Sequence, residues 1–434
     1  MRMFANLGLL VCTVAYGQQL TPVPPPATGL PAHPFFITKT WVIGGEGDWD
    51  YLTMDPTARQ LFIAHGSSVQ VVDVETGAVA GTISGMREAH EVVLDGDGGY
   101  GYVSDGQADM VRVFDRHSFQ VVASIPTGPS PRSMALDAAS GLLFVIGASP
   151  MGSGAVAQRG TRSVTTQQPG AGSRGTPSGA KSMVTVIDIQ RRIPLAQIVL
   201  PGSLGFAKGD GEGRVYVTVQ DRNQIIRLNA STVGSVIEQV TDEEALAEKK
   251  QATTQGGQRK TSEQPPLRLD LSTNIPPELH DAYPRSLSLD SSCQDPRALA
   301  IDRGHERLFV ACNNFRMVVL NPATGDTVAA LPIGPGPDAI GYDTNRGLIF
   351  TANGGGDGSV TIIRQDVTDT YAVIQTLPTR QHARTLAIDP STGNVYLTSV
   401  LYGAQMSTPF TNGSPAPLTV TPVDSSFQVL VVGN

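Results

Sequence analysis

Hydrophobic and polar positions alternate in short runs along most of the chain. In one recurring unit an apolar segment ends in a pattern such as Leu-x-x-Asp, a turn follows, and a second apolar run resembles Leu-Phe-Val-Ala. A run of the form Val-x-Val-x-Asp and a further segment that ends near glycine complete the unit. Short alternating runs bounded by turn residues predict β-strands, four to each unit. The clearest copies of the first two strands are residues 52–55 with 61–64, 136–137 with 143–145, 299–302 with 308–311, and 386–389 with 395–397.

An aspartate ends the first strand of each unit, and its spacing gives the number of units. These anchor aspartates are Asp55, Asp95, Asp137, Asp210, Asp302, Asp343 and Asp389. They are separated by 40, 42, 73, 92, 41 and 46 residues, which is a period slightly above 40 with an insertion in each long gap. Seven four-stranded units of this length predict an all-β protein, a seven-bladed β-propeller. The aspartates themselves are expected to accept backbone N–H bonds in Asx-turns.

The two ends of the chain are predicted to complete one blade together. Residues 35–44 (FFITKTWVIG) have the pattern of a fourth strand that precedes the first anchor, and residues 426–433 have that of a third strand. We therefore expect the N-terminal strand to close the ring, which removes the exposed edges of an open array.

The amino-acid composition and net charge exclude several classes of protein and of binding partner. Charged residues make up only 16% of the chain, and 47 glycines and 31 prolines indicate many turns. A hydrophobic fraction of 40% is enough for a large core, so wholesale disorder and a coiled coil are excluded. The net charge is −8 and no run of Lys and Arg exceeds two residues. Nucleic acid is thus excluded as a partner, because phosphates require a basic surface.

The first residues have the features of an export signal. Residues 1–17 combine a basic start at Arg2, a short apolar stretch and small residues before a cleavage site, and thus read as a signal peptide. Residues 18–33 form a proline-rich linker, and the propeller spans 34–434. No segment is long enough for a transmembrane span, so we expect a periplasmic or secreted monomer. A lipoprotein anchored through Cys12 is the alternative.

Removal of the signal peptide leaves two cysteines, Cys293 and Cys312. An even pair in an oxidising compartment suggests a disulfide, and both cysteines fall at the same end of the fifth unit. Two buried free thiols are the alternative.

Three inserts interrupt the repeats and are expected to be flexible: 151–181, 232–284 and 401–425. Two of them lie between second and third strands, and such loops emerge on one face of a propeller. They serve either as binding loops above that face or as tolerated surface loops without a role.

Four sequence motifs point to a family. They are residues 49–52 (WDYL), 72–77 (VDVETG), 296–302 (PRALAID) and 321–325 (NPATG). They resemble the repeats of the YVTN-type β-propeller proteins of bacteria, the YncE-like family. The resemblance covers residue 34 to the C-terminus outside the inserts, which depart from the family pattern. It implies an exported propeller and indicates little about activity.

Polar residues recur five positions before each anchor aspartate. The aligned residues, one from each unit, are Asp50, His90, Arg132, Gly205, Arg297, Asp338 and Arg384. This position begins the innermost strand, so these residues are expected to surround one mouth of the central tunnel. His65 and Asn353 end second strands, which return to the same mouth, and they join the candidate ligand-binding set.

The mouth permits three interpretations. Three arginines would attract an anion and grip a carboxylate or phosphate with paired hydrogen bonds. Asp50, His90 and Asp338 are the candidate ligands for a divalent cation, although no cofactor is indicated with confidence. The third interpretation is an Asp–Arg network that merely plugs the tunnel.

Two functions follow from these features. The first is a binding or scaffold protein that takes a small anionic ligand or another exported protein at the tunnel mouth. The alternative is a lactonase-like or lyase-like enzyme with a metal in the tunnel, in which His90 or His65 would act as general base. The chain has no Gly-x-Ser-x-Gly elbow and no His-Glu-x-x-His motif, which favours the binding role.

Overall fold

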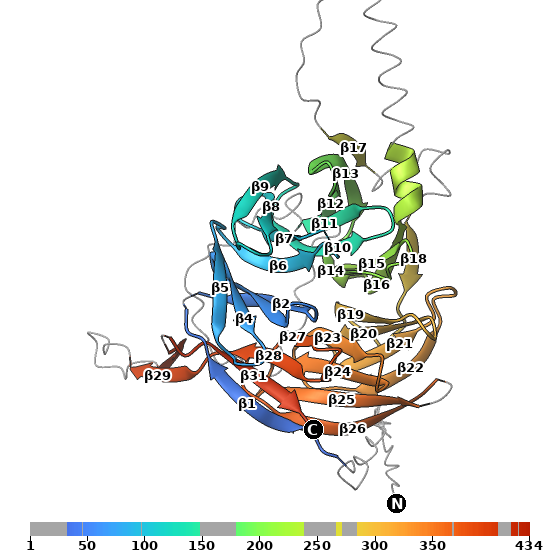
Figure 1. Ribbon diagram of the computed structural model, residues 1–434. Helices are drawn as coiled ribbons and strands as arrows, with labels where there is room; N and C mark the ends of the chain where they lie inside the picture. Colours follow the sequence, from blue (N-terminus) through green and yellow to red (C-terminus); the bar gives the residue numbers. More distant parts are fainter. Residues whose placement is uncertain are drawn as a thin grey trace, which may run out of the picture.

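The computed structural model describes residues 33–45, 47–96, 98–147, 179–237, 266–270, 284–366, 369–406, 418–423 and 425–434. The expected signal peptide, almost all of the linker and most of the inserts 151–181 and 232–284 lie outside these residues. Within them, seven sheets surround a central axis, so the predicted seven-bladed β-propeller is confirmed (Figure 1). The first strand of each blade contacts the first strand of the next around the ring. No helix in the described segments is long and apolar enough to cross a membrane.

Blades 1, 2, 5 and 6 are antiparallel four-stranded meanders. Blades 1 and 2 consist of β2 (Trp49–Asp55), β3 (Gln60–His65), β4 (Ser68–Asp73) and β5 (Val79–Ser84), then β6 (Ala89–Leu94), β7 (Tyr100–Asp105), β8 (Met110–Asp115) and β9 (Val121–Pro126). Blades 5 and 6 consist of β19 (Pro296–Asp302), β20 (Arg307–Cys312), β21 (Arg316–Leu320) and β22 (Thr327–Pro332), then β23 (Pro337–Asp343), β24 (Leu348–Asn353), β25 (Ser359–Asp366) and β26 (Thr370–Pro378).

Blades 3 and 4 are joined by the longest insert. Blade 3 consists of β10 (Pro131–Asp137), β11 (Leu142–Gly147), β12 (Lys181–Asp188) and β13 (Ile193–Pro201). Blade 4 consists of β14 (Leu204–Gly209), β15 (Arg214–Val219), β16 (Gln224–Asn229) and β18 (Arg285–Ser288), with a 3-10 turn η1 (Gln220–Arg222) and a helical segment at 230–237. The insert leaves blade 4 before its outer strand, and its own strand β17 (Leu267–Asp270) adds to blade 3 in parallel with β13.

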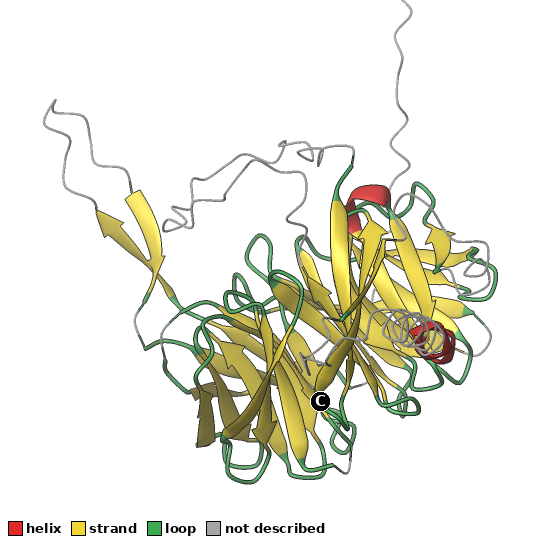
Figure 2. Ribbon diagram, turned by 90° about the horizontal axis from the view of Figure 1, so that it is seen from above, coloured by secondary structure: helices red, strands yellow, loops and turns green. Residues whose placement is uncertain are grey.

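Blade 7 contains both ends of the chain. Its strands are β27 (Leu386–Ile388), β28 (Val395–Ser399), β31 (Gln428–Gly433) and β1 (Phe36–Val42). The N-terminal β1 pairs antiparallel with the C-terminal β31, which confirms the predicted closure. The third insert, expected to be a flexible loop, contains a two-stranded ribbon, β29 (Tyr402–Met406) with β30 (Leu418–Pro422), which projects from one face of the disc (Figure 2).

The core lies between the blades. Phe62 of blade 1 and Phe114 of blade 2 are fully buried with ring centroids 5.7 Å apart. Trp49 of blade 1 packs in one cluster with Tyr396 and Phe427 of blade 7. Because both faces of most strands meet a neighbouring blade, the second and third strands read as nearly continuous apolar runs.

The anchor aspartates form Asx-turns, as predicted. Asp55 Oδ1 accepts the N–H groups of Thr57 and Ala58, each at 3.0 Å. Several anchors also bind the neighbouring blade: Arg59 of blade 1 donates to Asp389 of blade 7 at 2.6 Å. Burial opposes ionisation of Asp389, but the hydrogen bonds from Arg59 and its own turn outweigh it and lower its pKa. The anchors therefore hold the ring together on the face opposite the candidate mouth.

Candidate functional site

A break in strand pairing positions the mouth residues. In blades 3, 5 and 6 the pairing of the first two strands skips one residue, which is Arg132, Arg297 or Asp338. In blades 1, 2 and 4 it skips two, which are residues 50–51, 90–91 and 205–206. A bulge leaves its residue unpaired and redirects the side chain. In these six blades the ring position therefore corresponds to the bulge at the start of the inner strand, and Arg384 lies two residues before the inner strand of blade 7.

These bulges bring charges of several blades together. Asp338 interacts electrostatically with Arg384, Asp50, Arg297 and Arg132, which belong to blades 7, 1, 5 and 3. Its carboxylate is 36% exposed, so it faces an opening that solvent reaches. The pKa of Asp338 is raised, chiefly by burial and also by Asp50, although the three arginines act in the opposite direction.

Most ring charges have a partner in the mouth. Asp338 Oδ2 lies 3.2 Å from Nε of Arg384, whose Nη2 donates to the carbonyl of Trp49 at 3.0 Å. Nδ1 of His90 lies 2.7 Å from Oδ2 of Asp50. Part of the mouth is therefore an internally compensated network, as the plug interpretation requires.

Two arginines of the ring differ in whether a carboxylate lies close to them. Arg297 pairs with Asp295, which lies 2.5 Å away on the same loop. Arg132 is exposed, and within the described part of the chain no carboxylate lies within ion-pair distance of it. Its electrostatic interactions with Asp338 and Tyr51 act over a longer range. Arg132 is thus the ring cation available to an incoming group.

A cavity of about 270 Å³ opens beside these residues on blades 5, 6 and 7. It is lined by Arg297, Asn313, Gly336, Pro337, Asp338, Gly354, Gly355, His382 and Arg384. The glycine run belongs to the hairpin loop of β24 and β25, where a Cβ on Gly354 would lie 2.7 Å from Cβ of Arg384. Glycine is therefore needed for the close approach of loops that builds this wall. At the rim, the ring of His382 lies 5.0 Å from that of Tyr402, where the ribbon begins.

An aromatic pair forms the floor beneath the mouth. Tyr51 of blade 1 and Phe206 of blade 4 have ring centroids 5.3 Å apart, although their blades stand on opposite sides of the ring. Burial, and then the charges of Asp338, Asp50 and Glu91, raise the pKa of Tyr51 well above its usual range, so its hydroxyl stays protonated. The mouth is therefore a cup, because these rings meet across the axis.

Glu91 is a second buried group at this level. Its Oε2 accepts the N–H of Met134 at 2.6 Å, and the residue is 9% exposed. Burial raises the pKa of Glu91 to about 7, against the opposing effect of the Met134 hydrogen bond. The sequence analysis gave no role to Tyr51, Glu91 or Phe206. Each of the three directly follows a ring position. The other blades have small residues at this place, so the larger side chains could have been noticed in the sequence.

The structure places His65 and Asn353 apart from this set. Nδ1 of His65 lies 2.8 Å from Oε1 of Gln70, and its ring lies 4.0 Å from that of Phe427. The buried amide of Asn353 bonds to three hydroxyls, those of Thr351, Ser359 and Thr361. His65 thus packs between blades 1 and 7, and Asn353 joins strands of blade 6 through its hydrogen bonds.

The structure confirms the predicted disulfide, which supports the rim of the mouth. Cys293 and Cys312 have Cα atoms 5.4 Å apart and join the loop before β19 to the end of β20. Blade 2 makes the corresponding link with a hydrogen bond from the N–H of Arg87 to Asp105, at 2.9 Å. The disulfide of blade 5 thus replaces the hydrogen bond that, in blade 2, ties the loop before the inner strand to the end of the second strand.

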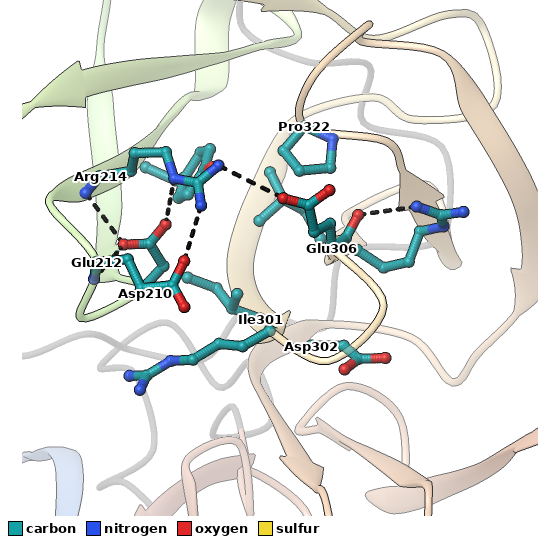
Figure 3. A pocket seen from close by; sticks show the side chains of 11 residues that line it. Asp210, Glu212, Arg214, Ile301, Asp302, Glu306 and Pro322 are labelled. Atoms are coloured by element: carbon teal, nitrogen blue, oxygen red, sulfur yellow. Dashed lines mark hydrogen bonds and ion pairs between the residues drawn. The ribbon is translucent and has the colours of Figure 1, made fainter.

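The candidate metal ligands do not form a cluster. Among the described residues, no group of three or more His, Cys, Asp or Glu side chains could hold a metal ion. A second hollow lies between blades 4 and 5, where Arg214 binds Asp210 at 2.6 Å and Glu212 at 3.0 Å (Figure 3). Its volume of about 20 Å³ has room for about one water molecule, so it is not a ligand site.

Comparison with known proteins identifies the fold. The sequence matches no family model and no curated protein. A chain of a mitotic checkpoint complex is similar in structure at 12% identity, with a TM-score of 0.57 over 91% of this chain and 96% of that one. The hydrazine synthase of Kuenenia stuttgartiensis is similar at 15% identity, with a TM-score of 0.56 over 83% of this chain and 95% of that one. U3-55K is similar at 9% identity, with a TM-score of 0.57 over 93% of this chain and 99% of that one. At such identities the likeness concerns the fold alone: the chain is a seven-bladed β-propeller repeat protein.

Proposed function

We propose that this is an exported, YncE-like binding protein that takes a small ligand with an anionic group into the cup at the tunnel mouth. The propeller fold suits a binding or scaffold role in general, and the site has to supply the specificity. The observation that carries the proposal is Arg132, an exposed guanidinium on a bulge, without a close carboxylate among the described residues. Guanidinium groups bind carboxylates and phosphates through paired, charge-assisted hydrogen bonds.

The size of the site supports a small ligand. The cavity of about 270 Å³ lies just below the usual range of about 300–1,000 Å³ for pockets that hold drug-sized molecules, so it suits a smaller ligand. Arg297 and Arg384, which line the cavity, are 35% and 32% exposed, and the Tyr51–Phe206 pair next to the ring positions offers aromatic contact. A ligand in the cup would therefore meet several charged groups and one apolar surface.

Export agrees with the chemistry of the chain. A disulfide persists in oxidising compartments, and Cys293–Cys312 is consistent with the signal peptide inferred from residues 1–17. A metal-dependent lactonase or lyase has less support, because Asp50 and His90 bond to each other rather than to a shared third ligand.

Binding of small anions to Arg132→Ala tests the proposal. Acetate, propanoate, succinate and inorganic phosphate are titrated calorimetrically into the wild-type protein and the variant. Loss of a charge-assisted hydrogen bond costs roughly 1.5–3 kcal/mol, which corresponds to about a 10- to 100-fold weaker affinity. Arg364→Ala is the matched control, because Arg364 forms an exposed pair with Asp366 on an outer part of blade 6.

The proposal predicts weaker binding by Arg132→Ala, unchanged binding by the control and an unchanged urea midpoint for both. It is wrong if none of the four anions binds the wild-type protein, or if Arg132→Ala binds them equally well. Unfolding of Arg132→Ala would instead favour the plug interpretation.

A further inference from the structure

The charges of the cup are arranged in two halves. Arg132 of blade 3 and Arg297 of blade 5 stand on either side of blade 4, whose ring position is Gly205. Asp338 of blade 6 and Asp50 of blade 1 stand on either side of blade 7. One side of the cup thus presents two guanidinium groups separated by a gap, and the other presents two carboxylates around Arg384.

The cup contains charges of both signs. Its three arginines lie near three aspartates, which are Asp50, Asp338 and Asp295, and His90 of the ring lies between Asp50 and Glu88. A simple anion is attracted by Arg132 but repelled by the carboxylates of blades 6 and 1. A ligand with separated positive and negative groups gains on both sides.

The two carboxylates of the acidic half also repel each other. Asp338 shares Arg384 with the carbonyl of Trp49, and Asp50 lies near enough to oppose its ionisation. The raised pKa of Asp338 has the same origin, since burial and Asp50 outweigh three arginines. A cation placed beside Asp338 and Asp50 would relieve this repulsion.

The floor suits the same kind of ligand. Tyr51 interacts electrostatically with Asp338 and Asp50 of the acidic half and with Arg132 of the basic half, and its ring lies 5.3 Å from that of Phe206. Aromatic faces pack against carbon skeletons and also attract ammonium groups. A short molecule can therefore span the cup with its carbon atoms against the floor.

We infer that the ligand class of the cup is a small zwitterion, such as a free amino acid. Its carboxylate would face Arg132 and Arg297, and its ammonium group would face Asp338 and Asp50. This inference rests on the proposed function and goes beyond it, because it requires a positive group on the ligand as well as a negative one.

Matched probes with a common carbon skeleton test the inference. L-alanine, propanoate and ethylamine form one set; L-phenylalanine, 3-phenylpropanoate and 2-phenylethylamine form a second. Each probe is titrated calorimetrically into the full, oxidised protein. We expect the amino acid of at least one set to bind at least tenfold more tightly than both the acid and the amine of that set.

Two variants locate the positive group. Asp338→Asn should reduce the preference for amino acid over acid to less than threefold, whereas Arg132→Ala should weaken both probes. Asp50→Asn provides a second variant if Asp338→Asn fails to fold. Asp366→Asn, an exposed carboxylate away from the cup, should leave all affinities unchanged.

The outcomes separate the two proposals. If the acid and the amino acid of a set bind equally well, the inference of a zwitterionic ligand is wrong and the proposal of an anion-binding site remains. If only the amine binds, or if no probe of either set binds, the inference of a zwitterionic ligand is wrong, and the titrations of succinate and phosphate then decide whether the anion site stands.

Discussion

The buried carboxyl of Glu91 makes the stability of the propeller depend on pH in a predictable direction. The pKa of Glu91 is raised from 4.5 to about 7 because the folded protein disfavours its charged form. Its contribution is therefore neutral below pH 4.5 and becomes progressively destabilising as the pH rises to 7. At about 1.4 kcal/mol for each pH unit, the cost above pH 7 is about 3 kcal/mol.

Glu91→Gln isolates this effect. The amide oxygen still accepts the Met134 N–H, and the variant carries no charge at any pH. Urea unfolding of both proteins at intervals from pH 4 to 9 gives the difference in the free energy of unfolding. Relative to the wild-type protein, Glu91→Gln should become more stable by about 3 kcal/mol between pH 4 and pH 8, with the change centred between pH 5 and 7.

The comparison cancels the contributions of ionisable groups that do not interact with Glu91. Glu75→Gln is the control, because the Glu75 side chain is 69% exposed and its replacement should give a difference that hardly varies with pH. A Glu91→Gln difference that is constant from pH 4 to 9, or that falls with rising pH, would refute the reasoning from burial.

Two further predictions concern the links that hold the ring. Cys293→Ala should lower the free energy of unfolding by roughly 3 kcal/mol, the loop-closure value for a bridge of this span, and a reductant should lower the urea midpoint of the wild-type protein but not of the variant. Asp389→Asn should lower the free energy of unfolding by about 2 kcal/mol, a value between those typical of exposed and of buried ion pairs. Asp366→Asn, which breaks an exposed pair, should lower it by less than about 1 kcal/mol in the same assay. Because the pKa of Asp389 is lowered by folding, its contribution is complete above pH 3.8 and should decrease as the pH falls further; a difference in the free energy of unfolding that does not shrink below pH 3.8 would contradict this assignment.

The repeat pattern was sufficient to predict the architecture because each blade repeats the same local signals. The period of the anchor aspartates gave the blade number, and the two half-units at the chain ends gave the closure. The position of Arg132 or Asp338 at the mouth followed from alignment alone, since equivalent positions in a propeller occupy equivalent places.

Features that depend on contacts between distant segments could not be read from the pattern. The segment 267–270 alternates like a strand, but its sequence does not indicate that it pairs with the outer edge of blade 3. The sequence also does not indicate how many residues each bulge skips. The contact between Tyr51 and Phe206 depends on that number and could not be predicted. The ribbon of β29 and β30 lies in a stretch rich in Pro, Gly, Ser and Thr, where strand signals are weak.

The pairing of β1 with β31 has a consequence for folding. Phe36 lies opposite Gly433, so β1 has its partner 397 positions later in the sequence. Until β31 has been made, β1 is an unpaired edge, and its aromatic and β-branched side chains are open to pairing with other chains. Such a separation in sequence also slows folding, because almost the whole polypeptide must be gathered before this contact forms. The seventh blade thus acts as a clasp that can fasten only after β31 has been made.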